Sequence, residues 1–507
     1  MLLILLAVTV VGVAGFVYLL TIPPPLERWL QGRMLLALRE HYQTDVQLEN
    51  LHVTLIPELY ATADNFVLSN RGRSDVPPLI TVKHMTIRAN LFELLRTPVR
   101  VSRVTLDGMV IKVAPKRDQQ DKEASTKPKY HTHLANFEID HVEAGGTLLY
   151  ILRKNPQAEP MLFELRKLAL NSAGVGQPMA FTAELTNPTP PGLIQTKGHF
   201  GPWNFDDPAA TPVDGDYDFQ HADLSVFAGI SGILSSQGKY TGALNNIVVD
   251  GKTDVPNFQL DSGGQEVHLT TKFHAIVDGT NGNTYLQPVN AHFLNSNVTT
   301  NGEVAGKPGQ KGKTITLAVD ISKAYVQDVL ALAAKGTPML TGGIVLKANL
   351  VLPPEKQTVL QRMQLNGTFD LSNARFTQEK MKSVMDGLSR RGQGKPGDTS
   401  IEDVASDFRG DFDLRHSTIT FTPLQFAMPG VAAQMKGSYG LTSGSLNFVG
   451  DVRLQATVSE AITGAKHVFL KPLDVLFKKN GAGTYLPVEV GGTREHPEVK
   501  LQWKKLF

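Results

Sequence analysis

A period of two in the apolar residues is the feature that most constrains how this chain can fold. Its most regular form is a phrase of glycine, spacer, aromatic, spacer and apolar residue, found as GDYDF at 215–219, GTFDL at 367–371, GDFDL at 410–414 and GSYGL at 437–441. Residues i, i+2 and i+4 of a β-strand lie on one face. Each phrase therefore predicts a strand with one apolar face. Because the copies are irregularly spaced, they indicate a long sheet built by repetition rather than a solenoid of fixed period.

Other alternating segments are separated by turn signals about 10–15 residues apart, which is typical of antiparallel strands. We expect strands from Val46 onward, including two pieces within 99–113 around Asp107-Gly108. An Asp-Gly pair between alternating pieces indicates a hairpin or a bulge. The later strands are expected to start at 137 and then to cover 148–152, 161–170, 179–185, 193–200, 217–224, 247–249, 266–277, 289–293, 314–321, 343–352 and 365–376.

Helical periodicity is rare in this chain. Apolar residues recur every four residues over 26–42, which predicts an amphipathic helix that docks on the first strands or lies along a membrane surface. Shorter helices are expected over 325–334, about 377–391 and about 459–479. The expected fold class is mainly β: an elongated stack of mostly antiparallel strands forming a curved apolar groove. An N-terminal transmembrane helix and a few short amphipathic helices complete it.

The chain begins with an apolar run. Residues 2–20 are nineteen residues without a charge, and a helix of that length covers roughly 28 Å, about one hydrocarbon core. A cleavable signal peptide has a shorter apolar run and a small-residue cleavage site, and the following TIPPPLERW offers no such site. We therefore expect an uncleaved transmembrane signal anchor over 1–22. The basic residues that follow it leave its orientation open, since long domains translocate largely regardless of flanking charge.

Shifts in pattern divide the rest of the chain into four parts. We expect an N-terminal helix plus strands over 23–114, a polar linker or loop over 115–133, a central β-groove over 134–356, and a C-terminal region over 357–507 that holds the last two helices. The linker is charged and almost without apolar residues, which is typical of a solvated segment.

Composition and motifs remove several classes of function. A net charge of +2 provides no basic surplus for nucleic acid. The chain has no cysteine, which excludes disulfides, zinc–cysteine sites and cysteine nucleophiles. Metalloprotease, nucleophile-elbow, P-loop and dinucleotide-binding motifs are missing from the sequence. We expect no enzyme activity, no catalytic residue and no cofactor.

Two segments carry side chains that ligate metals in other proteins. His131 and His133 lie in the polar linker without an acidic residue close by. The loop DGTNGNT from Asp278 has oxygen ligands as in a calcium loop but lacks the terminal Glu, so a Gly/Asn-rich hairpin turn is the stronger interpretation. We expect no metal site.

The apolar face of such a sheet must be hidden from water. It can be hidden by a second sheet, by helices or by curling into a groove, and few helices are predicted. A groove lined with apolar side chains needs an apolar occupant, and an acyl chain suits a body that is tethered to a membrane. Three phrases supply the candidate groove-lining residues: Phe369, Leu371, Phe412, Leu414, Tyr439 and Leu441.

Two regions of the chain resemble the AsmA family of bacterial envelope proteins. The first covers the anchor, the helix and the strands up to VRVSRVTLDGMVIKV at 99–113; the second begins with GTFDLSNARF at 367–376, continues through GLSRRGQG, and closes with LPVEVGGTREHPEVKL from Leu486. The resemblance implies an inner-membrane anchor with the body in the periplasm. It also implies a relation to bridge-like lipid transfer proteins, phospholipid transport between two membranes, and outer-membrane biogenesis. It supplies no catalytic residues.

The function expected from these features is an inner-membrane-anchored periplasmic protein that carries phospholipid acyl chains along an apolar β-groove. The alternative is an assembly factor that pairs exposed sheet edges with strands of outer-membrane proteins. An envelope enzyme is a third class. The expected partners are membrane lipids, the inner membrane through residues 2–20, and envelope proteins, but no nucleic acid.

Overall fold

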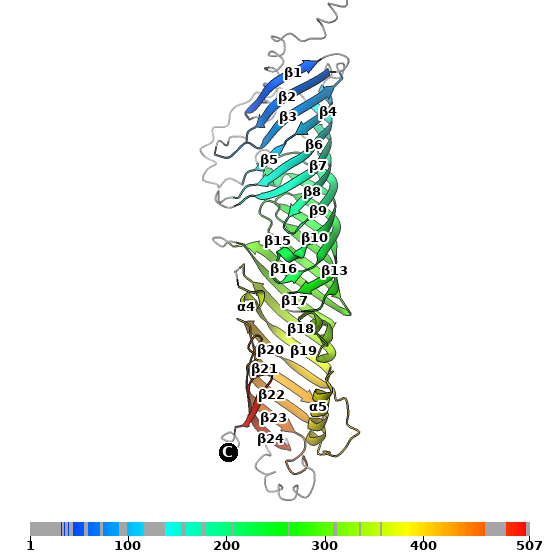
Figure 1. Ribbon diagram of the computed structural model, residues 1–507, viewed down its shortest axis with the longest axis vertical. Helices are drawn as coiled ribbons and strands as arrows, with labels where there is room; N and C mark the ends of the chain where they lie inside the picture. The colour runs from blue at the N-terminus through cyan, green and yellow to red at the C-terminus, as the bar shows by residue number, and fades with distance from the viewer. Residues whose placement is uncertain are drawn as a thin grey trace, which may run out of the picture. The chain divides into compact units, whose positions relative to one another are not determined.

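The computed structural model describes most of the chain from residue 44 to residue 502 (Figure 1). The described residues are 32, 35, 39, 44–54, 59–70, 73, 75–90, 99–115, 137–153, 159–174, 178–204, 207–261, 264–307, 312–333, 336–354, 357–461 and 483–502. The predicted anchor over 1–22, the linker beyond Pro115, and most of the helical segment predicted at 459–479 lie outside them. Within these described ranges, no helix has both the length and the apolarity needed to span a membrane.

The fold is mainly β, a long, groove-like antiparallel sheet with few helices. It divides into two compact units that interleave in sequence. Unit one consists of 1–222, 235–251 and 276–282, and unit two consists of 223–234, 252–275 and 283–507. Residues from the predicted central region at 134–356 therefore contribute to both units.

The described residues of unit one contain nine complete strands and all but the last residue of a tenth. They are β1 (Val46–Thr54), β2 (Leu59–Leu68), β3 (Ile80–Ala89), β4 (Val99–Asp107), β5 (Val110–Val113), β6 (Phe137–Ile151), β7 (Met161–Gly174), β8 (Met179–Pro188), β9 (Pro191–Phe200) and β10 (Pro212–Asp223, whose last residue belongs to unit two). Neighbours in the series β1–β2–β3 and β6–β7–β8–β9–β10 pair antiparallel. A short 3₁₀ turn, η2 (Pro208–Ala210), precedes β10.

Asp107-Gly108 forms neither the hairpin nor the bulge that it predicts, because the register with β3 and β6 is the same before and after Gly108. Both β4 and β5 pair antiparallel with β3 and parallel with β6, so they are two pieces of one strand position. Gly108 interrupts them with a φ of 63°, which is the left-handed conformation that glycine adopts easily. A parallel pair needs a long crossover connection, and the chain between Val113 and Phe137, where the polar linker is predicted, provides that length.

The first strands of unit one form a packed core. Its fully buried members include Ala63, Val82 and Ala144, and the partly buried Leu35 packs against them. Residues 32, 35 and 39 are helical, and the Arg39 Nε donates to the carbonyl of Val46 at 3.3 Å. The predicted amphipathic helix therefore docks on the first strands, as far as its described residues show.

Unit two carries the second half of the strands. Its complete strands are β11 (Ile230–Ser231), β15 (Thr284–Phe293), β16 (Ser296–Gly306), β17 (Lys313–Tyr325), β18 (Leu340–Leu352), β19 (Gln364–Phe376), β20 (Ser406–Arg415), β21 (Thr418–Met428), β22 (Val431–Gly440), β23 (Leu446–Leu454), β24 (Thr484–Gly492) and β25 (Pro497–Leu501). From β15 to β25 each strand pairs antiparallel with the next. Strands β12 (Ile233–Ala243), β13 (Asn246–Leu260) and β14 (Val267–Val277) contribute residues to both units.

Four short helices accompany the sheet of unit two: η3 (Leu224–Val226), α3 (Val326–Ala333), α4 (Val359–Arg362) and α5 (Glu379–Gly392). The helices expected at 325–334 and 377–391 are confirmed as α3 and α5, whereas the sequence did not predict α4. Helices α3 and α5 follow directly after strands β17 and β19, so both lie at strand ends (Figure 1).

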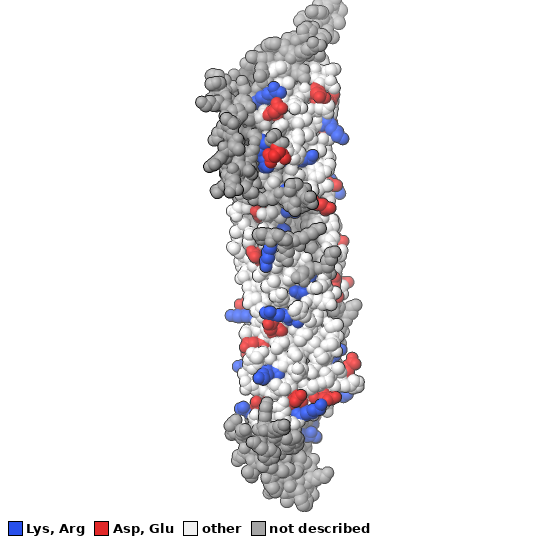
Figure 2. Space-filling model, turned by 90° about the vertical axis from the view of Figure 1, so that its left-hand side faces the viewer, with Lys and Arg blue, Asp and Glu red and all other residues white. Residues whose placement is uncertain are grey.

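Polar side chains occupy the other face of the strands. Cross-strand ion pairs join Arg409 to Asp370 at 3.3 Å and Lys347 to Asp320 at 3.9 Å. Exposed pairs of this kind stabilise a protein by no more than about 1 kcal/mol each. Figure 2 shows one face of the molecule, on which the charged side chains of the described residues lie scattered with both signs mixed. This face therefore carries no patch of a single sign among the described residues.

Candidate functional site

The candidate site is the apolar face of the unit-two sheet from β17 to β24. Strand register arranges its side chains in rows that run across the strands. The first row holds Leu317, Leu350, Leu365, Leu414, Ile419, Tyr439 and Leu446; the second holds Val319, Ala348, Gly367, Phe412, Phe421, Gly437 and Phe448; the third holds Ile321, Leu346, Phe369, Gly410, Leu424, Met435, Gly450 and Val488. The rows contain no charged residue, so they form a continuous apolar surface.

Five of the six candidate lining residues lie on this face. Leu371, Phe412 and Leu414 are buried, with 6%, 8% and 4% of their surface exposed, while Phe369 and Tyr439 are partly buried. Leu441 lies outside the rows, because β22 ends at Gly440 and the chain turns there. Its side chain is 39% exposed. The fifth residue of a phrase therefore lies on the apolar face only when the strand continues through it.

The glycines and aromatic residues of the phrase face each other across neighbouring strands. Gly367 lies opposite Phe412, and Phe369 lies opposite Gly410. A Cβ on Gly367 would lie 2.0 Å from the Lys347 carbonyl oxygen, and one on Gly410 would lie 2.3 Å from the Pro423 carbonyl oxygen. The phrase therefore recurs because each strand supplies both a ring and a position where the adjacent backbone approaches closely.

Unit one repeats this reciprocal arrangement with tyrosines. A Cβ on Gly215 would lie 2.7 Å from the Tyr240 hydroxyl oxygen, and one on Gly238 would lie 2.8 Å from the Tyr217 ring. The Tyr240 hydroxyl is 2.7 Å from the Thr196 hydroxyl, and that of Tyr217 is 3.0 Å from a serine hydroxyl. Burial raises the pKa of both phenols, because an apolar environment disfavours the phenolate.

The rings of unit two form a connected cluster. Ring centroids lie 6.2 Å apart for Phe369 and Phe412, 6.0 Å for Phe369 and Phe421, and 6.1 Å for Phe421 and Phe448. Phe421 and Phe448 are not among the six lining residues that the sequence predicts. Both lie in alternating segments that lack the full phrase, so alternation alone would have found them.

This face is incompletely covered. The rings of Phe369, Phe421 and Phe448 remain partly exposed, although they point to the apolar side. Helix α3 packs beside Ile344 and Leu371 at one end of the rows. Helix α5 packs beside Met428 and Leu454 at the same strand ends. These two helices therefore cover the face at one set of strand ends, and the rings farther along the strands stay partly exposed.

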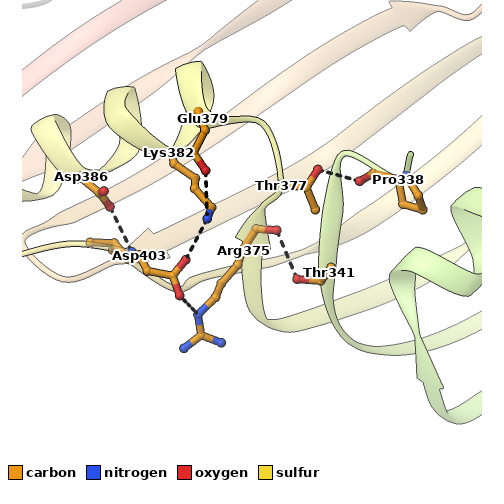
Figure 3. A network of polar contacts seen from close by, with 9 residues as sticks. Pro338, Thr341, Arg375, Thr377, Glu379, Lys382, Asp386 and Asp403 are labelled. Carbon is orange, nitrogen blue, oxygen red and sulfur yellow. Dashed lines mark hydrogen bonds and ion pairs between the residues drawn. The ribbon is translucent and has the colours of Figure 1, made fainter. Parts of the chain in front are cut away.

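A polar network holds α5 in this position (Figure 3). Asp403 accepts from Arg375 at 3.1 Å and is 4.0 Å from Lys382, which also pairs with Glu379 at 3.4 Å. The buried Asp386 carboxylate accepts the backbone N–H of Val404 at 3.0 Å. The network fastens the helix and the segment after it to β19.

The described residues offer little else for chemistry. They contain no group of three or more His, Asp or Glu side chains placed to hold a metal ion. The Asp278 carboxylate accepts hydrogen bonds from Thr280 and Asn281 within its own turn, as the turn interpretation predicts, whereas His131 and His133 lie outside the described residues. Comparison of the chain with protein-family models, with curated proteins and with solved structures gave no match.

Proposed function

We propose that this protein carries acyl chains of phospholipids along the apolar face of its sheet. In this proposal it is anchored in an inner membrane with its body in the periplasm, and it contributes to lipid transport and outer-membrane biogenesis. The observation that carries the proposal is the uninterrupted set of apolar rows with partly exposed rings at their centre. A soluble protein rarely leaves such a surface without an apolar occupant.

The rows suit a mobile occupant rather than a fixed one. Hydrophobic contact is non-directional and scales with the apolar area removed from water, at about 25 cal/mol per Å². Adjacent strands lie about 4.8 Å apart, so an acyl chain that advances by one strand exchanges one set of apolar contacts for a similar set. The apolar contacts of the rows therefore hold such a chain firmly without themselves imposing a large barrier to its movement.

The sequence supports a membrane as the source of the chain. Residues 2–20 form an uncharged apolar run, and the resemblance to the AsmA family, which is part of the proposal, associates such an anchor with lipid transport. An anchored body has a local reservoir of acyl chains, so it can load without extracting lipid over a long distance.

Photo-crosslinking in intact cells tests the proposal on the full chain. Cells are supplied with a photoreactive fatty acid that enters their phospholipids, and crosslinked peptides are mapped by mass spectrometry after illumination. We expect labelling over β19–β23 in the wild-type chain and at least a fivefold loss in Phe421→Asp, because a carboxylate on the apolar face costs several kcal/mol to desolvate.

The neighbouring Thr420→Asp is the matched control. Thr420 is exposed on the other face of the same strand, so this variant should label like the wild type. Unlabelled wild-type peptides, or equal labelling in both variants with preserved circular dichroism, would refute acyl-chain carriage.

A second candidate function rests on the last strand. Within the described residues β25 pairs with β24, and its Val499 is 67% exposed. An edge of this kind can accept a strand of a client protein, as an assembly factor for outer-membrane proteins would require. Pro497 and the Lys500–Glu498 pair on this edge are typical of edges protected against pairing. Client binding that survives Phe421→Asp would favour this candidate.

A further inference from the structure

Strand direction defines two margins for the sheet of each unit. In unit two, β17 ends at one margin and α3 follows it there; we call this the α3 margin. Strands β17, β18 and β19 pair antiparallel in turn, so β19 begins at the opposite margin. Helix α4 directly precedes β19, and we call this second one the α4 margin.

The two margins of unit two meet at Gly229. The Gly229 carbonyl accepts the N–H of Asp261, and the chain after Asp261 reaches α3, where the N–H of Gln265 donates to Ala331 at 2.7 Å. Gly229 therefore belongs to the α3 margin. A Cβ on Gly229 would lie 2.4 Å from Cγ2 and 3.2 Å from Cβ of Val359, the first residue of α4. This contact joins opposite sides of the sheet.

The margins of unit one meet through a hydrogen bond. Arg153 follows the end of β6, and three antiparallel pairings place the end of β9 at the opposite margin. Backbone bonds from Leu244 to Thr211 and from Gly279 to Leu244 stack the turn of Asn281 on the turn after β9. The Arg153 Nη1 nevertheless donates to the Asn281 carbonyl oxygen at 3.2 Å.

Unit one has a second such contact, which is apolar. Trp203 lies in the turn after β9 and packs on the buried cluster of Val46, Leu68 and Leu79. Those three residues lie beside β3 at the margin where β6 ends, because Leu68 is in register with Ile80 and β3 pairs with β5 beside the last residues of β6. Val46 is completely buried, so the contact covers the apolar face.

These three seam contacts (Gly229–Val359, Arg153–Asn281 and Trp203 on its cluster) share one geometry. Each joins opposite margins of one unit across the apolar face. A sheet whose margins touch encloses its inner face at that level, as in a barrel, but without the ladder of backbone hydrogen bonds that closes a barrel permanently. Each seam contact is a single local interaction, so it can separate without unfolding the strands.

We propose that the seam contacts are a gate along the apolar face. This inference rests on the proposed function. At a closed seam the inner face is enclosed, so the headgroup of a phospholipid cannot remain in water beside an acyl chain held on that face. A phospholipid therefore passes that level when the margins separate, and seam opening limits the rate of transfer.

Disulfide trapping tests the gate directly, since the chain contains no cysteine. The Cβ separation of 3.2 Å in Gly229→Cys with Val359→Cys is a few tenths of an ångström shorter than the range of about 3.5–4.5 Å found in disulfides, so a small shift of the margins lets the bond form. The full chain is reconstituted into vesicles of phosphatidylethanolamine and phosphatidylglycerol, and transfer of a pyrene-labelled phosphatidylethanolamine to acceptor vesicles is followed. We expect the oxidised variant to transfer at least tenfold more slowly than the reduced one and to recover on reduction.

The control crosslink is Thr368→Cys with Asp411→Cys, which joins adjacent strands on the exposed face and should leave transfer unchanged. A disulfide that fails to form at Gly229 and Val359 overturns the seam, and one that forms without slowing transfer overturns the gate. Absence of transfer in the wild-type chain overturns the proposed function and the gate with it. In that case the disulfide yield alone decides whether the margins meet.

A second variant avoids the strained backbone of Gly229, which has a φ of 98°. Arg153→Ala removes one hydrogen bond of the seam in unit one, and we expect transfer to become about fivefold faster if that opening limits the rate. Arg103→Ala is its control, because Arg103 is an exposed arginine paired with Glu143 on neighbouring strands. Equal transfer rates in these two variants would contradict a gate at Arg153.

Discussion

Replacement of Gly367 by alanine tests whether the recurring phrase reflects close backbone approach. The added Cβ would lie 2.0 Å from the Lys347 carbonyl oxygen and 2.7 Å from the Ala348 Cα. Both are backbone atoms of β18, so the strands must separate by about 1.4 Å to bring the 2.0 Å approach to an ordinary contact of 3.4 Å. Overpacking of this kind costs about 1–3 kcal/mol, and we expect the upper end because no flexible side chain can yield.

The reduced flexibility of the unfolded chain offsets part of this loss, since alanine in a strand gains roughly 0.5–1 kcal/mol over glycine. A net destabilisation of about 2 kcal/mol corresponds to roughly a thirtyfold rise in local opening. Hydrogen exchange of peptides covering β19 and β20 measures this opening directly. It also avoids fitting a two-state transition to a chain with two units.

Gly491→Ala is the matched control for this experiment. Gly491 also lies in a strand, β24. Apart from its two sequence neighbours, no described heavy atom lies within 4 Å of a Cβ built on Gly491. We expect exchange around β24 to be unchanged or slower in this variant. Exchange of β19 and β20 that stays within threefold of the wild type in Gly367→Ala would refute the close-approach explanation of the phrase.

Three further predictions concern the polar groups. Asp386→Ala leaves the partly buried N–H of Val404 without its acceptor, which costs about 1 kcal/mol and should accelerate hydrogen exchange over 393–405. Burial holds the pKa of Tyr240 above its usual value. The buried neutral phenol therefore contributes to stability below about pH 10, and this contribution is lost as the pH rises further. Tyr240→Phe should reduce the alkaline loss of stability measured by urea unfolding. Hydrogen bonds from His84 and then from Asn50 hold the pKa of Asp64 below its usual range. The ionised carboxylate therefore contributes to stability above about pH 4, and this contribution is lost as the pH falls. Asp64→Asn should reduce the acid loss of stability in the same assay.

Local sequence pattern determined many, but not all, of the elements of this fold; β16 (Ser296–Gly306) and β21 (Thr418–Met428), for example, were not predicted as strands. Alternation predicted a strand at 365–376, and β19 covers Gln364–Phe376; it predicted one at 193–200, and β9 covers Pro191–Phe200. The period of 3.6 residues predicted α3 and α5 within two residues of their bounds. These features are predictable because the faces of a strand or helix follow from residues that are close together in the chain.

Contacts between distant segments were decided by the tertiary structure alone. The parallel pairing of β4 and β5 with β6 depends on a crossover of more than twenty residues, which no local pattern encodes. The sequence showed the phrase but not that Gly367 faces Phe412, because register is a property of two strands together. The seam contacts of Arg153 and Gly229 depend on how the sheet curls over several strands. The alternation of apolar residues thus determined that the face exists, while strand pairing and twist decided what lies opposite each side chain.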